Sequence, residues 1–202
     1  MSKIAIHIIS RTGRIHWLQE AWLRKHCLKA DWIVTPYSVG MGRNASVVEF
    51  LQAGKEPFLL QLDDDIVLLP ETESILGTDE ALAYCTFPPR KSLPGIVQEI
   101  QPGCMRISRE ILEAMKPPWF EPLLDDTGSV QVRNEAWKLL EQARQMGIEP
   151  VRVGWAGHLV EVVAAYRGDL VSFAWPHEVR HEAPHRGAAQ SRGAPDGKGS
   201  PG

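Results

Sequence analysis

The feature that most constrains this chain is a run of three aspartates, Asp63-Asp64-Asp65, set between two apolar segments. Residues 58–62 read FLLQL and residues 66–69 read IVLL, so the carboxylates interrupt an otherwise apolar stretch. An apolar run of this kind suits a strand that is buried on both faces, as in a sheet covered by helices. In such folds ligands collect at the carboxyl ends of the strands, and the aspartates are expected there.

The rest of the chain alternates between strand and helix patterns. Apolar and β-branched runs predict strands at 3–9, 32–34, 81–87, 103–108 and 151–153, and helical spacing predicts helices at 15–25, 40–53, 109–115 and 134–146. Ser108 is a reasonable N-cap for the third helix, and Gly54 and Gly147 can end the second and the fourth. The alternation predicts an α/β fold with a mostly parallel central sheet flanked by helices.

One domain is expected over residues 1–176, followed by a flexible tail over residues 177–202. After Pro176 the sequence is rich in Gly, Pro, His, Arg and Ser, and it has too little apolar content to offset the entropy of ordering. The apolar run at the N-terminus is too short to span a membrane, and no transmembrane segment is expected elsewhere. These features predict a cytoplasmic protein.

Charge and cysteine content exclude several classes of function. The chain has 22 Lys plus Arg and 25 Asp plus Glu, which gives a net charge of -3 and no global basic field for nucleic acid. Cys27, Cys85 and Cys104 are odd in number, widely spaced and without a CxxC pair. This pattern argues against a disulfide framework and a zinc cluster, and favours buried, reduced thiols.

The aspartate run is itself a candidate metal site. Three adjacent carboxylates repel one another, and a divalent cation relieves that repulsion. If the strand continued through the run, Asp63 and Asp65 would share a face and Asp64 would point away. Oxygen ligands favour Mg²⁺ or Mn²⁺, which commonly keep substrate phosphates in their coordination shell. The alternative, a solvated acidic turn, agrees less well with the apolar segments on both sides.

Four segments in order resemble the GT-A fold glycosyltransferases, in particular the inverting, family-2-like enzymes. GRNASVVEFLQAGKEPFLLQLDDDIVLLPE resembles their Arg-Asn helix and Asp-x-Asp strand, and PGCMRISREILEAMKPPWFEP resembles their acceptor-side strand and helix. DDTGSVQVRNEAWKLLEQARQMG resembles the stretch that carries the family's Glu-Asp pair, and WAGHLVEV a late strand with a histidine. The resemblance covers roughly residues 3–163, and it implies transfer of a sugar from a UDP- or GDP-sugar to an acceptor hydroxyl.

The resemblance also implies roles for individual residues. Asp63 would lie near the ribose with Asp64 beside the donor, and Asp65 would bind the metal through the diphosphate. Asp63 and His158 would be further metal ligands. Arg43 and Asn44 would lie near the nucleotide, and the loop Ser10-Arg11-Thr12 near the base.

Two departures from the family pattern affect these roles. Where the family has Glu-Asp, this chain has Asn134-Glu135, so Glu135 is the candidate general base, expected in the first turn of a helix, and Asp125 and Asp126 are its competitors. The family's second nucleotide-contacting aspartate has no clear match, and Asp31 is the nearby candidate.

Two other functions remain open on the sequence. The Asp63-x-Asp65 pattern after an apolar strand also resembles the haloacid-dehalogenase phosphatases, in which Asp63 would be the nucleophile, Asp65 the acid/base and Mg²⁺ the cofactor. The second alternative is a catalytically silent protein that binds nucleotide-sugars or acts as a scaffold on the GT-A fold.

Overall fold

The structure is a computed structural model that describes residues 4–14, 17–26, 28–34, 38–86, 102–124, 126–128 and 131–158. The elements in order are β1 (Ile4–Ser10), α1 (Trp17–Lys25), β2 (Asp31–Val34), α2 (Val39–Ala53), β3 (Phe58–Asp63), β4 (Ile66–Val67), a 3₁₀ turn (Pro70–Glu73), α3 (Ser74–Gly77), β5 (Leu82–Thr86), β6 (Cys104–Ser108), α4 (Arg109–Ala114), β7 (Leu123–Leu124), β8 (Gln131–Arg133), α5 (Trp137–Gln145), β9 (Val151–Trp155) and β10 (Gly157–His158).

Six of these strands form the central sheet, in the order β2-β1-β3-β6-β5-β9. The pairs β1/β2, β1/β3 and β5/β9 are parallel, whereas β6 runs antiparallel to both of its neighbours. The carboxyl ends of β1, β2 and β3 therefore meet at one edge, which is also where β6 begins. Beside this edge, β4 pairs with β10, and β7 pairs with β8.

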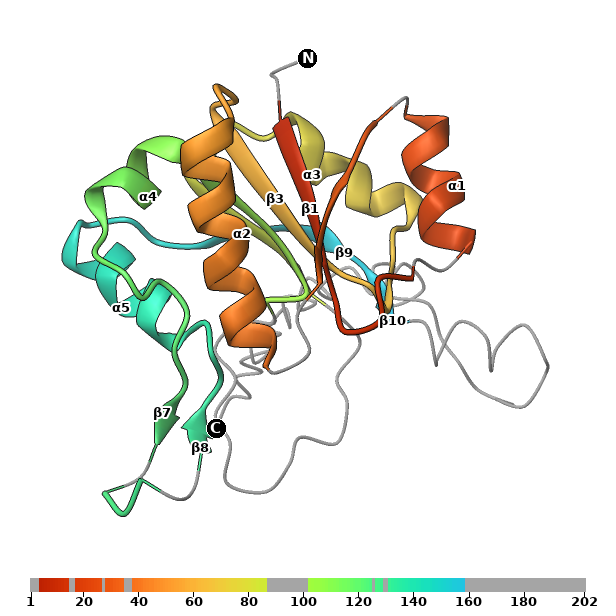
Figure 1. Cartoon of the computed structure of the whole chain (residues 1–202). Coiled ribbons are helices and arrows are strands. Elements are labelled where there is room, and N and C mark those ends of the chain that lie inside the picture. The colour runs from red at the N-terminus through yellow and green to blue at the C-terminus, as the bar shows by residue number, and fades with distance from the viewer. Residues whose placement is uncertain are drawn as a thin grey trace, which may run out of the picture.

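Helices cover both faces of the sheet, as predicted. Figure 1 shows α2, α4 and α5 on one side and α1 and α3 on the other. One apolar cluster joins α2, α4 and α5 to the sheet through residues such as Phe50, Ile111 and Leu139. A second joins α1 and α3 to the opposite face through residues such as Trp22 and Ile75. The α/β class with a sheet flanked by helices is confirmed.

Helix α2 carries Arg43 and Asn44, and both of its ends are fixed. At its start the Ser38 side chain accepts a hydrogen bond from the Met41 N–H, which is the N-cap geometry. At its end the Arg109 guanidinium donates to the carbonyls of Phe50 at 2.8 Å and Gly54 at 2.9 Å. A cation at the C-terminal carbonyls also offsets the helix dipole, so α2 is a firm support for the residues it carries.

The last described helix begins later than the sequence predicts. The 134–146 pattern yields α5 only from Trp137, because Asn134, Glu135 and Ala136 form a turn in which the Trp137 N–H donates to the Asn134 carbonyl at 3.1 Å. The Ser108 N-cap is confirmed, since its side chain accepts from the Ile111 N–H.

Some predictions fall on residues that the structure does not describe, among them the 176/177 domain boundary, the tail and Cys27. Cys85 and Cys104 are buried free thiols, as expected. Among the described residues, no helix combines the length and the apolar character that a membrane span needs.

Candidate functional site

A cavity of about 420 Å³ lies at the carboxyl ends of β1 and β3. It is lined by Ile9, Ser10, Arg11, Thr12, Val39, Asp63, Asp64 and Asp65. The structure thus brings together six of the residues that the sequence analysis singled out, from two segments about fifty positions apart. Strand pairing explains this, since Ile9 of β1 lies beside Asp63 of β3 in the parallel ladder.

The Ser10 hydroxyl organises the loop that follows β1. Its Oγ donates to Asp64 Oδ2 at 2.6 Å and accepts from the backbone N–H groups of Thr12 at 3.1 Å and Gly13 at 2.9 Å. Gly13 has a φ of 66°, which favours glycine, so the loop turns sharply here. The loop is therefore tied directly to the aspartate run.

The expectation that Asp64 points away from Asp63 and Asp65 is wrong. Strand β3 ends at Asp63, and Asp64 and Asp65 lie in a turn, so strand alternation does not apply to them. All three aspartates line the same cavity. A backbone hydrogen bond also holds Asp64 at this cavity, because its N–H donates to the Ile9 carbonyl at 3.1 Å.

Asp63 is held from three sides. Its N–H donates to the Gly103 carbonyl at 2.9 Å, its carbonyl accepts from Gln19 Nε2 at 3.0 Å, and its Oδ1 accepts from Arg43 Nη2 at 2.6 Å. Its side chain keeps an exposed fraction of 24%. Burial raises the pKa of the Asp63 carboxyl above its ordinary value; Arg43 opposes this shift, while Asp65, Glu135 and Asp64 add to it. A further cation at this site would favour the ionised form.

Arg43 links Asp63 to the candidate base. The guanidinium has no exposed surface, and its Nε lies 3.6 Å from Glu135 Oε1. The Glu135 side chain keeps an exposed fraction of 22%. Both carboxylates therefore lie within ion-pair distance of one buried cation, although Glu135 is not among the residues that line the cavity of Asp63.

Glu135 is outside the first turn of α5, contrary to expectation, because the helix begins at Trp137. The helix dipole therefore does not act on it as a first-turn acid. Instead its carbonyl accepts from the Glu121 N–H at 2.8 Å, which fixes its backbone. Its competitor Asp126 lies in an exposed turn after β7, and Asp125 is outside the described residues. Of the two candidates that the structure describes, Glu135 and Asp126, Glu135 is the one that lies beside Arg43.

The Asn44 side-chain amide forms its hydrogen bonds within the protein. Its Nδ2 donates to the Phe120 carbonyl at 2.7 Å, and its Oδ1 accepts from the N–H groups of Trp119 at 2.9 Å and Phe120 at 3.0 Å. Trp119 and Phe120 are buried in the core. A contact between Asn44 and a nucleotide stays a prediction, while its structural contacts are plain.

The carboxylates at this cavity fit a metal ion that would be coordinated partly by the protein and partly by a bound ligand. Within the described ranges, no three His, Cys, Asp or Glu side chains converge so that they could hold an ion alone. A hard divalent ion that keeps phosphate oxygens needs only one or two protein carboxylates, and Asp63 and Asp65 line one cavity. His158 lies in β10, opposite Ile66 in the ladder with β4 and so close to the aspartate turn; its side chain is outside the described residues.

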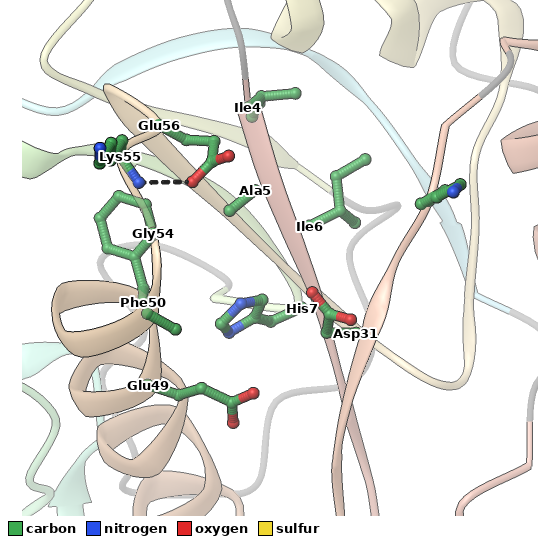
Figure 2. A pocket seen from close by; sticks show the side chains of 12 residues that line it. Ile4, Ala5, Ile6, His7, Asp31, Glu49, Phe50, Gly54, Lys55 and Glu56 are labelled. Atoms are coloured by element: carbon green, nitrogen blue, oxygen red, sulfur yellow. Dashed lines mark hydrogen bonds between the residues drawn. The ribbon is translucent and has the colours of Figure 1, made fainter.

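A second, larger cavity of about 610 Å³ lies toward the amino ends of β1 and β2. Figure 2 shows its lining, in which His7, Asp31 and Glu49 lie around one region of the cavity and Lys55 and Glu56 lie beyond them. Asp31 of β2 pairs with His7 of β1 in the parallel ladder, and His7 lies three residues before Ser10. The structure therefore places Asp31 in this other cavity, and it does not replace the missing nucleotide-contacting aspartate.

Sequence reasoning missed Gln19, which is fully buried in α1 and donates to Asp63. A signal for it was present, because Gln19 lies next to Leu18 and three residues before Trp22, on the side of the helix that carries the apolar positions. A polar residue on an apolar helix face needs a partner, and here the partner is the carbonyl of a candidate site residue.

No protein-family model and no curated protein matches this chain. Among solved structures, "A197 from STIV" is 19% identical with a TM-score of 0.46, over 59% of this chain and 72% of that one. A glycosyltransferase involved in the glycosylation of the major capsid of PBCV-1 is 17% identical with a TM-score of 0.37, over 57% and 69%. A Drosophila β-1,4-galactosyltransferase 7 mutant, in complex with manganese, UDP-Gal and xylobiose, is 14% identical with a TM-score of 0.46, over 90% and 81%. Likenesses at this level assign no activity to the chain.

Proposed function

We propose that this chain is a metal-dependent glycosyltransferase of the GT-A type. It moves a sugar from a UDP- or GDP-sugar to an acceptor hydroxyl, with inversion. The observation that carries the proposal is the cavity where the Ser10 loop meets Asp63, Asp64 and Asp65 at the carboxyl ends of parallel strands. Nucleotides commonly bind at this edge of an α/β sheet.

Each part of the cavity suits one part of a nucleotide-sugar. Asp63 and Asp65 would hold Mn²⁺ or Mg²⁺ together with the diphosphate, and His158 would be a further ligand. When bound, the ion supplies positive charge that neutralises the departing diphosphate. Arg11 and Thr12 are exposed on the loop beside the cavity and would contact the nucleotide, with Ser10 holding the loop in place.

Glu135 is the proposed general base. A carboxylate within hydrogen-bond reach of an acceptor hydroxyl can accept its proton as the hydroxyl oxygen attacks the anomeric carbon. Glu135 suits this role because it is partly exposed and lies beside Arg43, the same cation that Asp63 contacts. Its backbone carbonyl accepts a hydrogen bond from Glu121, which fixes the backbone from which the carboxylate extends.

The contacts of Asp63 argue against the phosphatase alternative. A nucleophilic aspartate must present an oxygen to the phosphorus atom, and one of the two Asp63 oxygens, Oδ1, already accepts a 2.6 Å bond from a buried arginine. This pairing lowers the nucleophilicity of the carboxylate. It suits a carboxylate that binds a sugar hydroxyl or a metal ion and forms no covalent bond.

The direct test is binding and hydrolysis of a panel of UDP- and GDP-sugars, with Mn²⁺, with Mg²⁺ and with a chelator. We expect one donor to be selected in a metal-dependent manner by the wild type, and the selection to be lost in Asp65→Asn. The matched control is Glu49→Gln, a carboxylate-to-amide change in the other cavity, which should leave donor binding unchanged.

Other outcomes identify the alternatives. Metal-independent binding, or retained binding by Asp65→Asn, removes the proposed metal role of Asp65. Phosphate release from a phosphomonoester without response to any donor indicates the phosphatase. Donor binding without hydrolysis, unchanged in Glu135→Gln, indicates the catalytically silent binding protein.

A further inference from the structure

We propose that Arg43 and Asn44 form a clamp that sets the position of Glu135 relative to Asp63. In this role they are positioning residues, and the buried guanidinium works through the two carboxylates beside it. The catalytic part of this inference rests on the proposed function. The structural part, a coupling between Arg43 and Glu135, stands independently of it.

The first observation is that the Arg43 guanidinium is fully buried and incompletely bonded. Its Nη2 donates to Asp63, whereas its Nε and Nη1 have no hydrogen-bond acceptor among the described residues. A buried charged donor without an acceptor is costly, so an arginine persists here only where acceptors are close. The nearby carboxylate is Glu135, with Oε1 3.6 Å from Nε.

The second observation is the path of α2 beside Glu135. A Cβ added at Gly40 would lie 3.4 Å from the Glu135 Cβ and 3.9 Å from the Phe120 carbonyl oxygen. The first turns of α2 therefore pack directly against both segments. Arg43 also lies over the Phe120 ring, with its Cζ 5.9 Å from the ring centroid. The guanidinium is thus enclosed by the helix, Phe120 and the two carboxylates.

The third observation is the bonding of the adjacent residue. Asn44 makes three hydrogen bonds to the backbone of Trp119 and Phe120, using both its amide nitrogen and its oxygen. The next residue, Glu121, donates its N–H to the Glu135 carbonyl. Asn44 therefore holds the backbone that supports Glu135, and the Arg43 guanidinium lies within ion-pair distance of its carboxylate.

This arrangement connects the two halves of the proposed reaction. Asp63 belongs to the strand that carries the donor-side residues, and Glu135 belongs to the segment that precedes α5. Because the Arg43 guanidinium is buried and bonded to Asp63, its charge constrains where the Glu135 carboxylate lies relative to Asp63. A small displacement of a general base lowers turnover strongly, because proton transfer needs hydrogen-bond reach.

The chain offers a matched control in Arg106. Arg106 is also fully buried, its Nε and Nη2 also have no acceptor among the described residues, and it stacks 3.5 Å over the Phe58 ring. Its Nη1 donates to the Thr78 carbonyl, and it has no contact with Asp63 or Glu135 in the described structure. Arg106→Met therefore reproduces the loss of a buried guanidinium without touching the clamp.

The activity test measures Mn²⁺-dependent hydrolysis of the selected nucleotide-sugar by Arg43→Met, Arg43→Lys and Arg106→Met. We expect Arg43→Met to lower kcat about 100-fold, the lower end of what a general base contributes, and also to raise KM, because Asp63 on the donor side loses its bonded partner. Arg43→Lys keeps the charge but reaches one carboxylate, and should recover part of kcat. Arg106→Met should leave kcat unchanged in the folded fraction.

The decisive comparison adds Glu135→Gln to Arg43→Met. If Arg43 acts by positioning Glu135, the double variant should be no slower than the slower single variant, because the base is already ineffective. Effects that multiply in the double variant would overturn the inference, as would a loss of kcat in Arg106→Met equal to that in Arg43→Met.

A folding measurement tests the clamp without any substrate. The urea midpoints of Arg43→Met, Glu135→Gln and the double variant should be non-additive, with the double variant more stable than the sum of the single losses predicts. If no donor binds but this coupling is present, the proposed function fails and the clamp stands. Additive midpoint shifts would overturn the clamp even if the enzyme turns over a donor.

Discussion

The two cavities along β1 differ in a way that size does not reveal. Residues 4–7 line the larger cavity of about 610 Å³, and Ile9 and Ser10 line the smaller one of about 420 Å³. The larger is lined by the cations Lys29 and Lys55 and by three acids, whereas the smaller gathers three aspartates against Arg11 alone. The smaller cavity therefore has the greater excess of negative charge.

Topology explains why the greater excess of negative charge is found at one end of the strand. At the carboxyl ends of β1 and β3, two chain segments leave the sheet as loops, so side chains from both segments converge there. At the other end, the strand β1 and the second half of α2 form the walls, and the lining contains both lysines and acids. Convergence of like charge at loop-forming strand ends is the better guide to a ligand site.

The largest expected difference is between the effects on turnover of two matched substitutions, Glu135→Gln and Glu49→Gln. Glu135→Gln should lower turnover of the selected donor by about 1000-fold with donor affinity retained, because an amide cannot accept the acceptor's proton. Glu49→Gln, in the larger cavity, should leave turnover unchanged. Steady-state hydrolysis together with calorimetric titration of the donor measures both quantities. Normal turnover in Glu135→Gln would remove Glu135 from the reaction.

A matched pair of serines gives the next largest effect. Ser10→Ala removes the hydroxyl that joins Asp64 to the loop, and we expect UDP–Mn²⁺ affinity to fall about tenfold, or about 1.4 kcal/mol. Ser46→Ala instead breaks the buried contacts of Ser46 with His7 and Gln61, at the larger cavity. It should lower the urea midpoint and leave UDP affinity unchanged. Equal loss of affinity in both variants would contradict the separation of the two ends.

The sequence predicts the sheet and the aspartate cluster well because both depend on local signals. Apolar runs and turn residues mark β1, β3 and β6 within about two positions, and the cluster at the end of β3 is visible as three carboxylates in an apolar context. The ends of parallel strands meet whatever the details of packing, so the meeting of Ser10 with Asp64 follows from the strand order.

The remaining features depend on contacts between distant segments, which local patterns do not encode. The pairing of Arg43 with Asp63 spans 20 positions, and its pairing with Glu135 spans far more. Asn44 looks like a ligand-facing residue in the sequence, yet its partners are the backbone groups of Trp119 and Phe120. Glu135 shows the same limit, since a helical pattern starting at Asn134 is overridden by the turn that binds Glu121.

A pair of glycines tests how tightly the loop at the smaller cavity is packed. Gly13 and Gly128 both have positive φ, 66° and 70°, so alanine at either should cost about 1–2 kcal/mol of folding free energy. A Cβ at Gly13 would also lie 3.3 Å from Val34 Cγ2, whereas one at Gly128 meets nothing within 4 Å. Gly13→Ala should therefore be the less stable variant in urea, and should also weaken UDP binding. Identical urea midpoints of the two variants would show that the Ser10 loop accommodates the added methyl group without further loss of stability.

The smallest effect belongs to the larger cavity, and it depends on pH. Burial lowers the pKa of His7 below its ordinary 6.5, while Glu49, Asp31 and Glu56 partly oppose this. The unfolded chain therefore takes up a proton at a higher pH than the folded protein does. Stability from the neutral His7 is complete above about pH 6.5 and falls as the pH drops through this value toward the folded-state pKa.

His7→Gln removes this titration, so its free energy of unfolding should change less between pH 7.5 and pH 5.5 than that of the wild type. Urea unfolding at the two pH values measures the difference, and the wild-type carboxylates cancel in the comparison because both proteins contain them. Binding of UDP–Mn²⁺ at pH 7.5 should be unaffected, since His7 bonds to Ser46 and lines only the cavity at the amino end of β1. A variant that loses nucleotide affinity while keeping the wild-type pH slope would reverse the roles assigned to the two cavities.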